Sequence, residues 1–211
     1  MWAGPSSQRP EARKAKTKWM VKDPESFKAQ LGKDIEALVR KSERLGMTPA
    51  VRINGTSDLP KLAWEMAEKY PDVQFYDYTK HPRPWEHTRP NYHLTFSLSE
   101  TNEAAAKAAL DHGVNVAVPF FVKKGAPLPK EFLGRPVIDG DLTDLRFLDK
   151  GDGVVVGLRA KGRAKKDVTG FVKHNPDLVQ IKPATGKPAT PEEKATAPQT
   201  RHEEYLGEAW R

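Results

Sequence analysis

The chain has 211 residues, of which 37% are hydrophobic and 30% are charged, and its formal net charge is +7. This length suits one domain of ordinary size with tails, and the absence of Cys excludes disulfides, thiolate nucleophiles and an iron–sulfur cluster held by this chain. The sequence has neither an apolar run near the roughly 18 residues of a membrane span nor a secretion signal. We therefore expect a protein of the cytoplasm, the host cell's if a phage encodes it, with no membrane partner.

The positive charge is concentrated in two flanking segments. Subtracting Asp and Glu from Lys and Arg gives +5 over residues 1–22, −2 over 23–158, +6 over 159–187 and −2 over 188–211. The termini have few apolar residues, and segments of that kind rarely bury enough surface to become ordered. We expect a flexible basic N-terminus over 1–18, one α/β domain over 19–173, and a largely disordered tail rich in Pro, Ala and Thr over 174–211.

Helical and strand patterns alternate along the middle of the chain. Asp23 and Pro24 are typical of a helix start, and an amphipathic pattern runs from there to Gly46. The elements predicted next are a strand at 49–54, a helix at 60–70, strands at 73–78 and 92–97, a helix at 99–112, and strands at 114–122, 136–139 and 153–158. This order favours parallel pairing. The expected fold is α/β, as a partial β/α barrel or an open, mostly parallel sheet with flanking helices.

Polar residues follow several of these strands, where α/β folds usually bind their ligands. The predicted binding residues are Asn54, Thr56, Ser57, Asp58, Tyr78, Ser97, Ser99, Arg146, Arg159, Arg163, Lys165 and Lys166. The candidates for acid–base catalysis are Asp77, Lys80, Glu100, Asp139, Asp141 and Lys161. A purely structural interpretation stays open, with Asp58 and Ser99 as helix N-caps and Asp77 as a solvated strand end.

Asp139, Asp141 and Asp144 form the densest carboxylate cluster in the sequence. Hard cations such as Mg²⁺ or Ca²⁺ bind clustered oxygen ligands, so these three residues are candidate ligands of a divalent cation. A turn in which Asp144 caps a short helical segment explains the same residues equally well. We expect no other cofactor.

Several segments together resemble one protein family. They are VRINGTSD (51–58), PDVQFYDYTK (71–80), NYHLTFS (91–97), VIDGD (137–141), DLRF (144–147) and GLRAKG (157–162). This series resembles bacteriophage and prophage proteins such as mycobacteriophage gene product eighty-eight, a family without a settled activity. Its longer members have a Cys cluster that looks like a degenerate radical-SAM site on a β/α barrel. Because this chain has no Cys, the resemblance implies neither an iron–sulfur cluster nor radical chemistry here.

Three functions fit these patterns. The leading hypothesis is a small phage accessory protein that binds a nucleic acid, a nucleotide or a host protein through the strand ends and a basic flank. The first alternative is an enzyme on a reduced barrel that uses the carboxylate and Lys residues, with or without a metal. The second is an anti-defence inhibitor of a host nuclease or effector. Overall we expect binding rather than catalysis.

Overall fold

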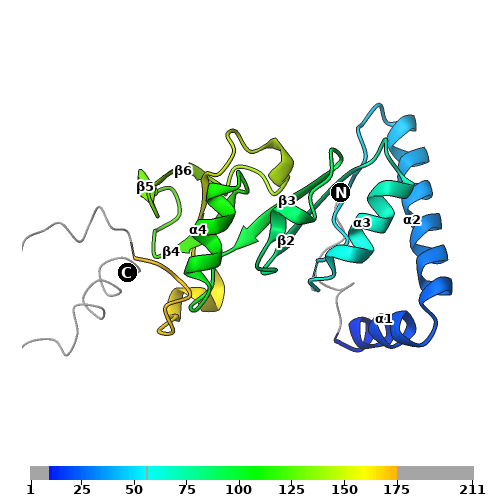
Figure 1. Cartoon of the computed structure of the whole chain (residues 1–211), viewed down its shortest axis with the longest axis horizontal. Coiled ribbons are helices and arrows are strands. Elements are labelled where there is room, and N and C mark those ends of the chain that lie inside the picture. Colours follow the sequence, from blue (N-terminus) through cyan, green and yellow to red (C-terminus); the bar gives the residue numbers. More distant parts are fainter. Residues whose placement is uncertain (1–9, 56, 175–211) are drawn as a thin grey trace, which may run out of the picture.

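The computed structural model of the chain describes residues 10–55 and 57–174. Its elements are α1 (Pro10–Lys22), α2 (Pro24–Arg44), β1 (Ala50–Val51), α3 (Pro60–Lys69), β2 (Gln74–Thr79), η2 (Pro84–Glu86), β3 (Tyr92–Ser97), α4 (Glu103–Asp111), β4 (Val116–Phe120), β5 (Glu131–Phe132), β6 (Arg135–Asp139), η3 (Arg146–Leu148), β7 (Val155–Arg159) and η4 (Gly162–Lys166), where η marks a 3₁₀ helix. The molecule is elongated, with α1, α2 and α3 at one end and the sheet extending away from them (Figure 1). In these residues no helix is long and apolar enough to cross a membrane.

The N-terminal segment contains a helix that the sequence patterns do not predict. The sequence predicts a flexible segment over 1–18, and from residue 10 onward the described part of this segment begins the helix α1. Residues 10–22 are rich in Ala, Lys and Arg, which are strong helix formers. Trp19 of α1 also packs edge-on against Phe27 of α2, with 5.4 Å between the ring centroids. Residues 1–9 and the predicted tail from residue 175 onward lie outside the described residues.

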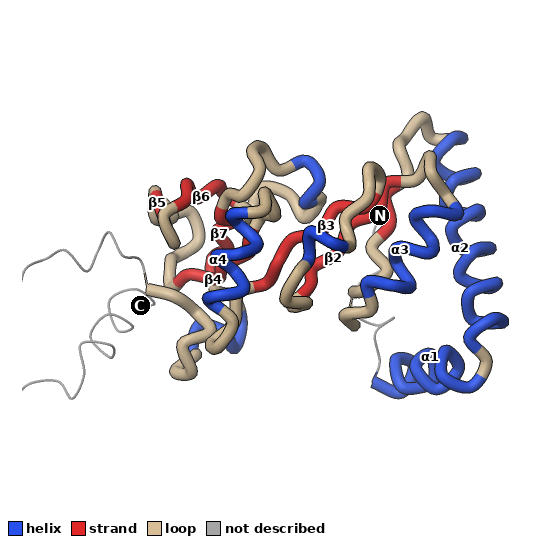
Figure 2. The backbone as a smooth tube through the Cα atoms, viewed as in Figure 1, coloured by secondary structure: helices blue, strands red, loops and turns tan. Residues whose placement is uncertain are grey.

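One seven-stranded sheet forms the centre of the fold, with the order β1-β2-β3-β4-β7-β6-β5. All neighbouring strands are parallel except β5 and β6, which are antiparallel. The predicted α/β class with a mostly parallel sheet is thus confirmed. The strand order is not the consecutive one of a β/α barrel, because β7 returns to pair between β4 and β6. Figure 2 shows the strands, in red, extending from β5 and β6 at one end of the sheet toward α3 at the helical end of the molecule.

The two faces of the sheet are covered differently. Tyr92 and Leu94 of β3 pack with α3, and Phe96, two residues further along the same face, packs with α4. The opposite face carries the connection from β6 to β7, where Phe147 of η3 contacts Tyr76 of β2, with 5.5 Å between ring centroids. The helices therefore cover one face, and a helix-poor connection crosses the other.

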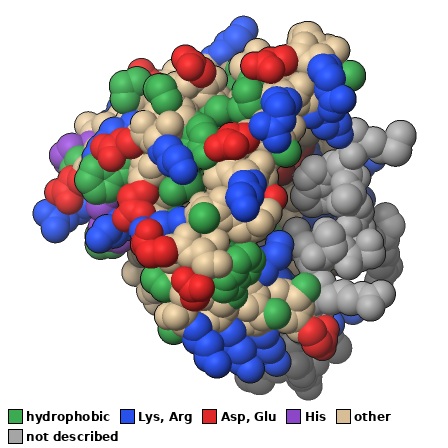
Figure 3. Space-filling model, turned by 90° about the vertical axis from the view of Figure 1, so that its right-hand side faces the viewer, with side chains coloured by type: hydrophobic (Ala, Val, Ile, Leu, Met, Phe, Trp, Pro, Cys, Tyr) green, Lys and Arg blue, Asp and Glu red, His purple; other side chains and the backbone are tan. Residues whose placement is uncertain are grey.

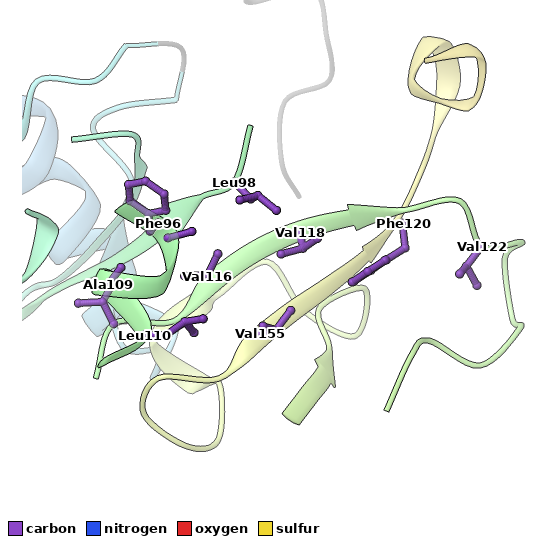
Figure 4. Packing of buried hydrophobic residues seen from close by; sticks show 11 residues of the cluster. Phe96, Leu98, Ala109, Leu110, Val116, Val118, Phe120, Val122 and Val155 are labelled. Carbon is purple, nitrogen blue, oxygen red and sulfur yellow. The ribbon is translucent and has the colours of Figure 1, made fainter. Parts of the chain in front are cut away.

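The larger core cluster joins strands that are far apart in the sequence. Figure 4 shows side chains of β3, β4 and β7 meeting beside α4, among them Phe96, Val116, Val118 and Val155. The exposed fraction of Val116, Val118 and Val155 is 0%. Burial of each such side chain favours folding by about 1.5–3 kcal/mol, so this cluster holds β7 firmly next to β4.

Candidate functional site at the strand ends

A cavity of about 640 Å³ opens at the C-terminal ends of the parallel strands. Its polar lining comes from the ends of β1, β2, β3, β6 and β7 and from the loops that follow them. These polar residues are Arg52, Tyr78, Lys80, Ser97, Asp141, Thr143, Asp144, Arg159 and Lys161. Because parallel strands bring their C-terminal ends to one edge, residues more than 100 positions apart in the chain converge here. We call this space the strand-end cavity.

The cavity holds a network of ion pairs between β6 and β7. Nη1 of Arg159 lies 2.9 Å from both carboxylate oxygens of Asp139 and 3.0 Å from Oδ2 of Asp141. Lys161 donates to Oδ1 of Asp141 at 2.8 Å. The remaining guanidinium donors of Arg159 reach the carbonyl oxygen of Ala126. Arg159, which is only 11% exposed in its side chain, therefore ties three segments together.

This network keeps both carboxyl groups ionised. The hydrogen bonds from Arg159 lower the pKa of Asp139. Burial acts to raise the pKa of Asp141, but the hydrogen bonds from Lys161 and Arg159 outweigh burial and lower it. Asp141 thus behaves as a fixed negative charge near neutral pH, a state suited to positioning Lys161 rather than to donating a proton.

Two further cations of the cavity have no acidic partner within the described residues. The guanidinium of Arg52 lies over the ring of Tyr78, with 4.6 Å between Cζ and the ring centroid, and its Nε is buried without a hydrogen-bond partner among these residues. Lys80 is exposed and pairs with no carboxylate in the same residues. The cavity therefore offers two cationic side chains that form no ion pair within the described residues.

Asp77 does not belong to this cavity. It is 1% exposed and lies on the helix-covered face of β2, where it accepts hydrogen bonds from the backbone and side-chain nitrogens of Asn54 and from the hydroxyl of Tyr92. Burial raises the pKa of Asp77 to about 6. The interpretation of Asp77 as a solvated strand end is therefore wrong, because its buried carboxylate joins the segment after β1 to β2 and β3.

The polar residues of the loop after β1 also have structural roles. The side-chain oxygen of Asn54 accepts hydrogen bonds from the hydroxyl of Ser57 and the backbone of Leu59. Asp58 is not a helix cap, because its carboxylate accepts from the hydroxyl of Thr79 and the backbone nitrogen of Lys80, both at 2.7 Å. Thr56 lies outside the described residues. This loop shapes the edge of the site without lining the strand-end cavity.

The other predicted site residues lie around the cavity rather than in its lining. Ser99 is 9% exposed, and its backbone nitrogen donates a hydrogen bond to the side-chain oxygen of Asn102. The N-cap residue of α4 is Asn102, not Ser99 as predicted. Glu100 accepts a hydrogen bond from the hydroxyl of Thr169. Arg146 is fully buried and donates to the backbone carbonyl oxygens of Gly140 and Thr143. The basic residues Arg163, Lys165 and Lys166 lie in η4, whose residue Ala164 lines the cavity.

The predicted cation ligands do not form a ligand cluster. Asp139 and Asp141 bind Arg159 and Lys161, and Asp144 lines the cavity without joining them. Among residues 10–55 and 57–174, no group of three His, Cys, Asp or Glu side chains is arranged to hold a metal ion. Asp139 and Asp141 pair with protein cations instead.

Sequence reasoning missed the other lining residues of the cavity, among them Arg52, Thr143 and Phe171. Arg52 had a usable signal, because a cation directly after a short apolar strand lies at a strand end. Phe171 had none, since the loop after η4 shows no periodicity and its approach to the cavity depends on tertiary packing. Of the predicted residues, the structure brings together Tyr78, Lys80, Ser97, Asp141, Asp144, Arg159 and Lys161.

The fold and the cavity define an α/β protein with a basic ligand-sized cavity at the strand ends of a mostly parallel sheet. The family model described as Gene product 88 matches residues 6–175, so the chain belongs to this family of phage proteins. Comparison with the curated proteins and with the solved structures finds no significant match.

Proposed function

We propose that this protein binds nucleic acid through the strand-end cavity and the basic segment that borders it. The observation that carries the proposal is the pair of cations in the cavity, Arg52 and Lys80, whose side chains form no ion pair within the described residues. Phosphates are the anions that such clusters commonly bind, and Tyr78 and Phe171 add aromatic surface in the same cavity. The cavity volume of about 640 Å³ suits a ligand of nucleotide size.

The position of η4 adds to this argument. The turn of residues 159–167 carries five Lys and Arg residues and one Asp, and it follows β7 directly into the cavity wall. A strand of nucleic acid whose nucleotide enters the cavity would extend its neighbouring phosphates over this segment. This segment begins the basic flank of residues 159–187, whose net charge is +6.

Binding is favoured over catalysis by the state of the carboxyl groups. Acid–base catalysis needs a group whose pKa lies near the working pH. In the cavity the pKa of Asp141 is lowered by its hydrogen bonds with Lys161 and Arg159, and Asp77, whose pKa is raised toward neutrality, faces the other side of the sheet.

Fluorescence anisotropy with labelled DNA and RNA, over a range of salt concentrations, tests the proposal. The double variant Arg52→Gln/Lys80→Gln should reduce the slope of log affinity against log salt by about 1.4, because each contact to a single-strand phosphate contributes about 0.7. The matched control is Lys33→Gln/Arg40→Gln on α2, which removes two exposed charges that do not line the strand-end cavity. Equal behaviour of both variants, or no binding of any nucleic acid, would overturn the proposal and favour a host protein as the partner.

A further inference from the structure

A second cavity lies next to the strand-end cavity, between α1 and the loop after β1. It has a volume of about 340 Å³, and its walls combine cations with apolar side chains. Arg13 and Lys16 come from α1, while Phe27 and Leu62 come from α2 and α3. We call this space the α1 cavity. Neither Arg13 nor Lys16 pairs with an acidic side chain in the described part of the chain.

Arg52 lines both cavities, so they adjoin at this residue. The strand-end cavity continues on its far side into η4, which provides the second basic flank of the sequence. Figure 1 shows α1 and the segment around η4 toward the same lower side of the molecule. The tertiary structure therefore places α1 and η4, which belong to the two basic flanks and lie about 140 positions apart in the chain, along the C-terminal edge of the sheet.

The charge of α1 is distributed over two sides of the helix. Arg13, Lys16 and Met20 line the α1 cavity, whereas Lys14 and Lys18 do not. In Figure 3, Lys and Arg side chains gather at the lower end of the surface, the height at which Figure 1 places α1. The helix α1 thus carries two pairs of cations, one that lines this cavity and one that does not.

We propose that the ligand is a single strand of nucleic acid that runs from the strand-end cavity, past Arg52, into the α1 cavity. This inference rests on the proposed function and specifies its ligand. A duplex keeps its bases stacked inside and presents only its outer surface to a protein, whereas an unpaired strand can insert nucleotides into cavities of this size. Cations spaced along a track, with Tyr78 and Phe27 as aromatic walls, match the pattern of proteins that bind single strands.

Anisotropy with labelled oligothymidylates of about 4 and about 12 nucleotides tests the track, because site sizes of single-strand binders span that range. The full chain should bind the longer strand more tightly than the shorter one, and more tightly than a duplex of the same length. Arg13→Ala/Lys16→Ala should lower the salt slope for the longer strand by about 1.4 and leave the shorter strand unaffected. Lys14→Ala/Lys18→Ala is the control, since it makes the same change of charge on the same helix.

The outcomes separate the two proposals. If the short strand binds but greater length adds no affinity, or if both variant pairs behave alike, the two-cavity track is wrong and the proposed function stands. Tighter binding of the duplex would also overturn the single-strand inference. If neither oligonucleotide nor duplex binds, the proposed function itself fails. Far-ultraviolet circular dichroism of both pairs confirms that α1 keeps its helix content, because Ala is the strongest helix former.

Discussion

The guanidinium of Arg52 lies over the ring of Tyr78, with 4.6 Å between Cζ and the ring centroid, at the point where two cavities meet. Arg52 follows β1 and Tyr78 lies near the end of β2, so the contact depends on the parallel pairing of these strands. Stacking on Tyr78 orients the guanidinium while leaving its charge available, because a ring offers no counter-charge.

Arg52→Lys and Arg52→Gln should separate charge from stacking. Lys keeps the positive charge but lacks the planar group that stacks on Tyr78, whereas Gln loses the charge. We expect the salt slope of oligonucleotide binding to stay unchanged in Arg52→Lys and to fall by about 0.7 in Arg52→Gln. Both variants should lose only about 0.5–1 kcal/mol of unfolding free energy, the contribution of a partly exposed cation–π contact. A fall in slope in both variants would show that the guanidinium geometry matters more than its charge.

Arg159→Ala should destabilise the protein through the network at the end of β7. The change leaves Asp139 without its cation and removes the donors to the carbonyl of Ala126. We expect a loss of about 2–3 kcal/mol at pH 7, below the usual cost for a fully buried pair because the Asp139 side chain is 34% exposed. Urea denaturation of the wild type and the variant measures this difference in unfolding free energy. Arg159→Lys should recover part of the loss, since Lys restores the positive charge but not the hydrogen bonds to the carbonyl oxygen of Ala126.

The same network of ion pairs predicts that the stability of the protein depends on pH. The folded-state pKa of Asp139 is lowered, so its stabilisation is present above the ordinary value of 3.8 and is lost as the pH falls through the folded value. The difference in unfolding free energy between the wild type and Arg159→Ala should therefore shrink on acidification below pH about 4. A difference that stays constant from neutral to acidic pH would argue against the ion pairs.

The buried carboxyl group of Asp77 predicts that stability changes with pH in the opposite direction. Its folded-state pKa is raised from 3.8 to about 6, so the folded protein binds the proton more tightly than the unfolded chain. Stability should fall as the pH rises from about 4 to about 6, by up to about 3 kcal/mol from this group, and level off above. Asp77→Asn removes the titrating group, so the unfolding free energy of the variant should rise relative to that of the wild type between pH about 4 and about 6. Parallel stability curves of the two proteins in urea denaturation would contradict the prediction.

Gly140→Ala tests the packing of the turn after β6. A Cβ at this position would meet Cγ1 of Val156 at 2.5 Å and Nη1 of Arg146 at 2.8 Å. Such overpacking typically lowers the unfolding free energy by about 1–3 kcal/mol, a loss that thermal or chemical denaturation detects. Gly55→Ala is the control, because nothing lies within 4 Å of a Cβ there, and it should leave stability within about 0.5 kcal/mol of the wild type.

Much of the local structure was predictable from the sequence. The start of α2 was indicated by Asp23 and Pro24, and Asp23 does accept a hydrogen bond from the backbone nitrogen of Ser26. The alternation of β2 and the apolar run of β4 placed these strands correctly. Local signals of this kind depend on periodicity and caps, which neighbouring residues alone set. The short β5 and the helix α1 lacked such signals, and neither was predicted.

The strand-end cavity was only partly predictable. Sequence order indicated that Tyr78, Ser97 and Lys161 follow or end strands, and the structure brings them to one cavity. The side of the sheet to which each residue points was not determined, because alternation distinguishes two faces without saying which one the helices cover. Asp77 shows this limit, since it lies one residue before Tyr78 and faces the opposite side.

The sequence by itself determined that the chain has no Cys, that its excess positive charge lies in two flanks, and that helices alternate with strands between them. Only the tertiary structure decided that β7 pairs between β4 and β6, which places Arg159 between Asp139 and Asp141 and brings η4 to the cavity. Only the packing of α1 against α2 brought this helix, which belongs to the first flank, to the same edge. The physical reason is that strand order and helix docking depend on contacts between distant residues, whereas composition and periodicity are local.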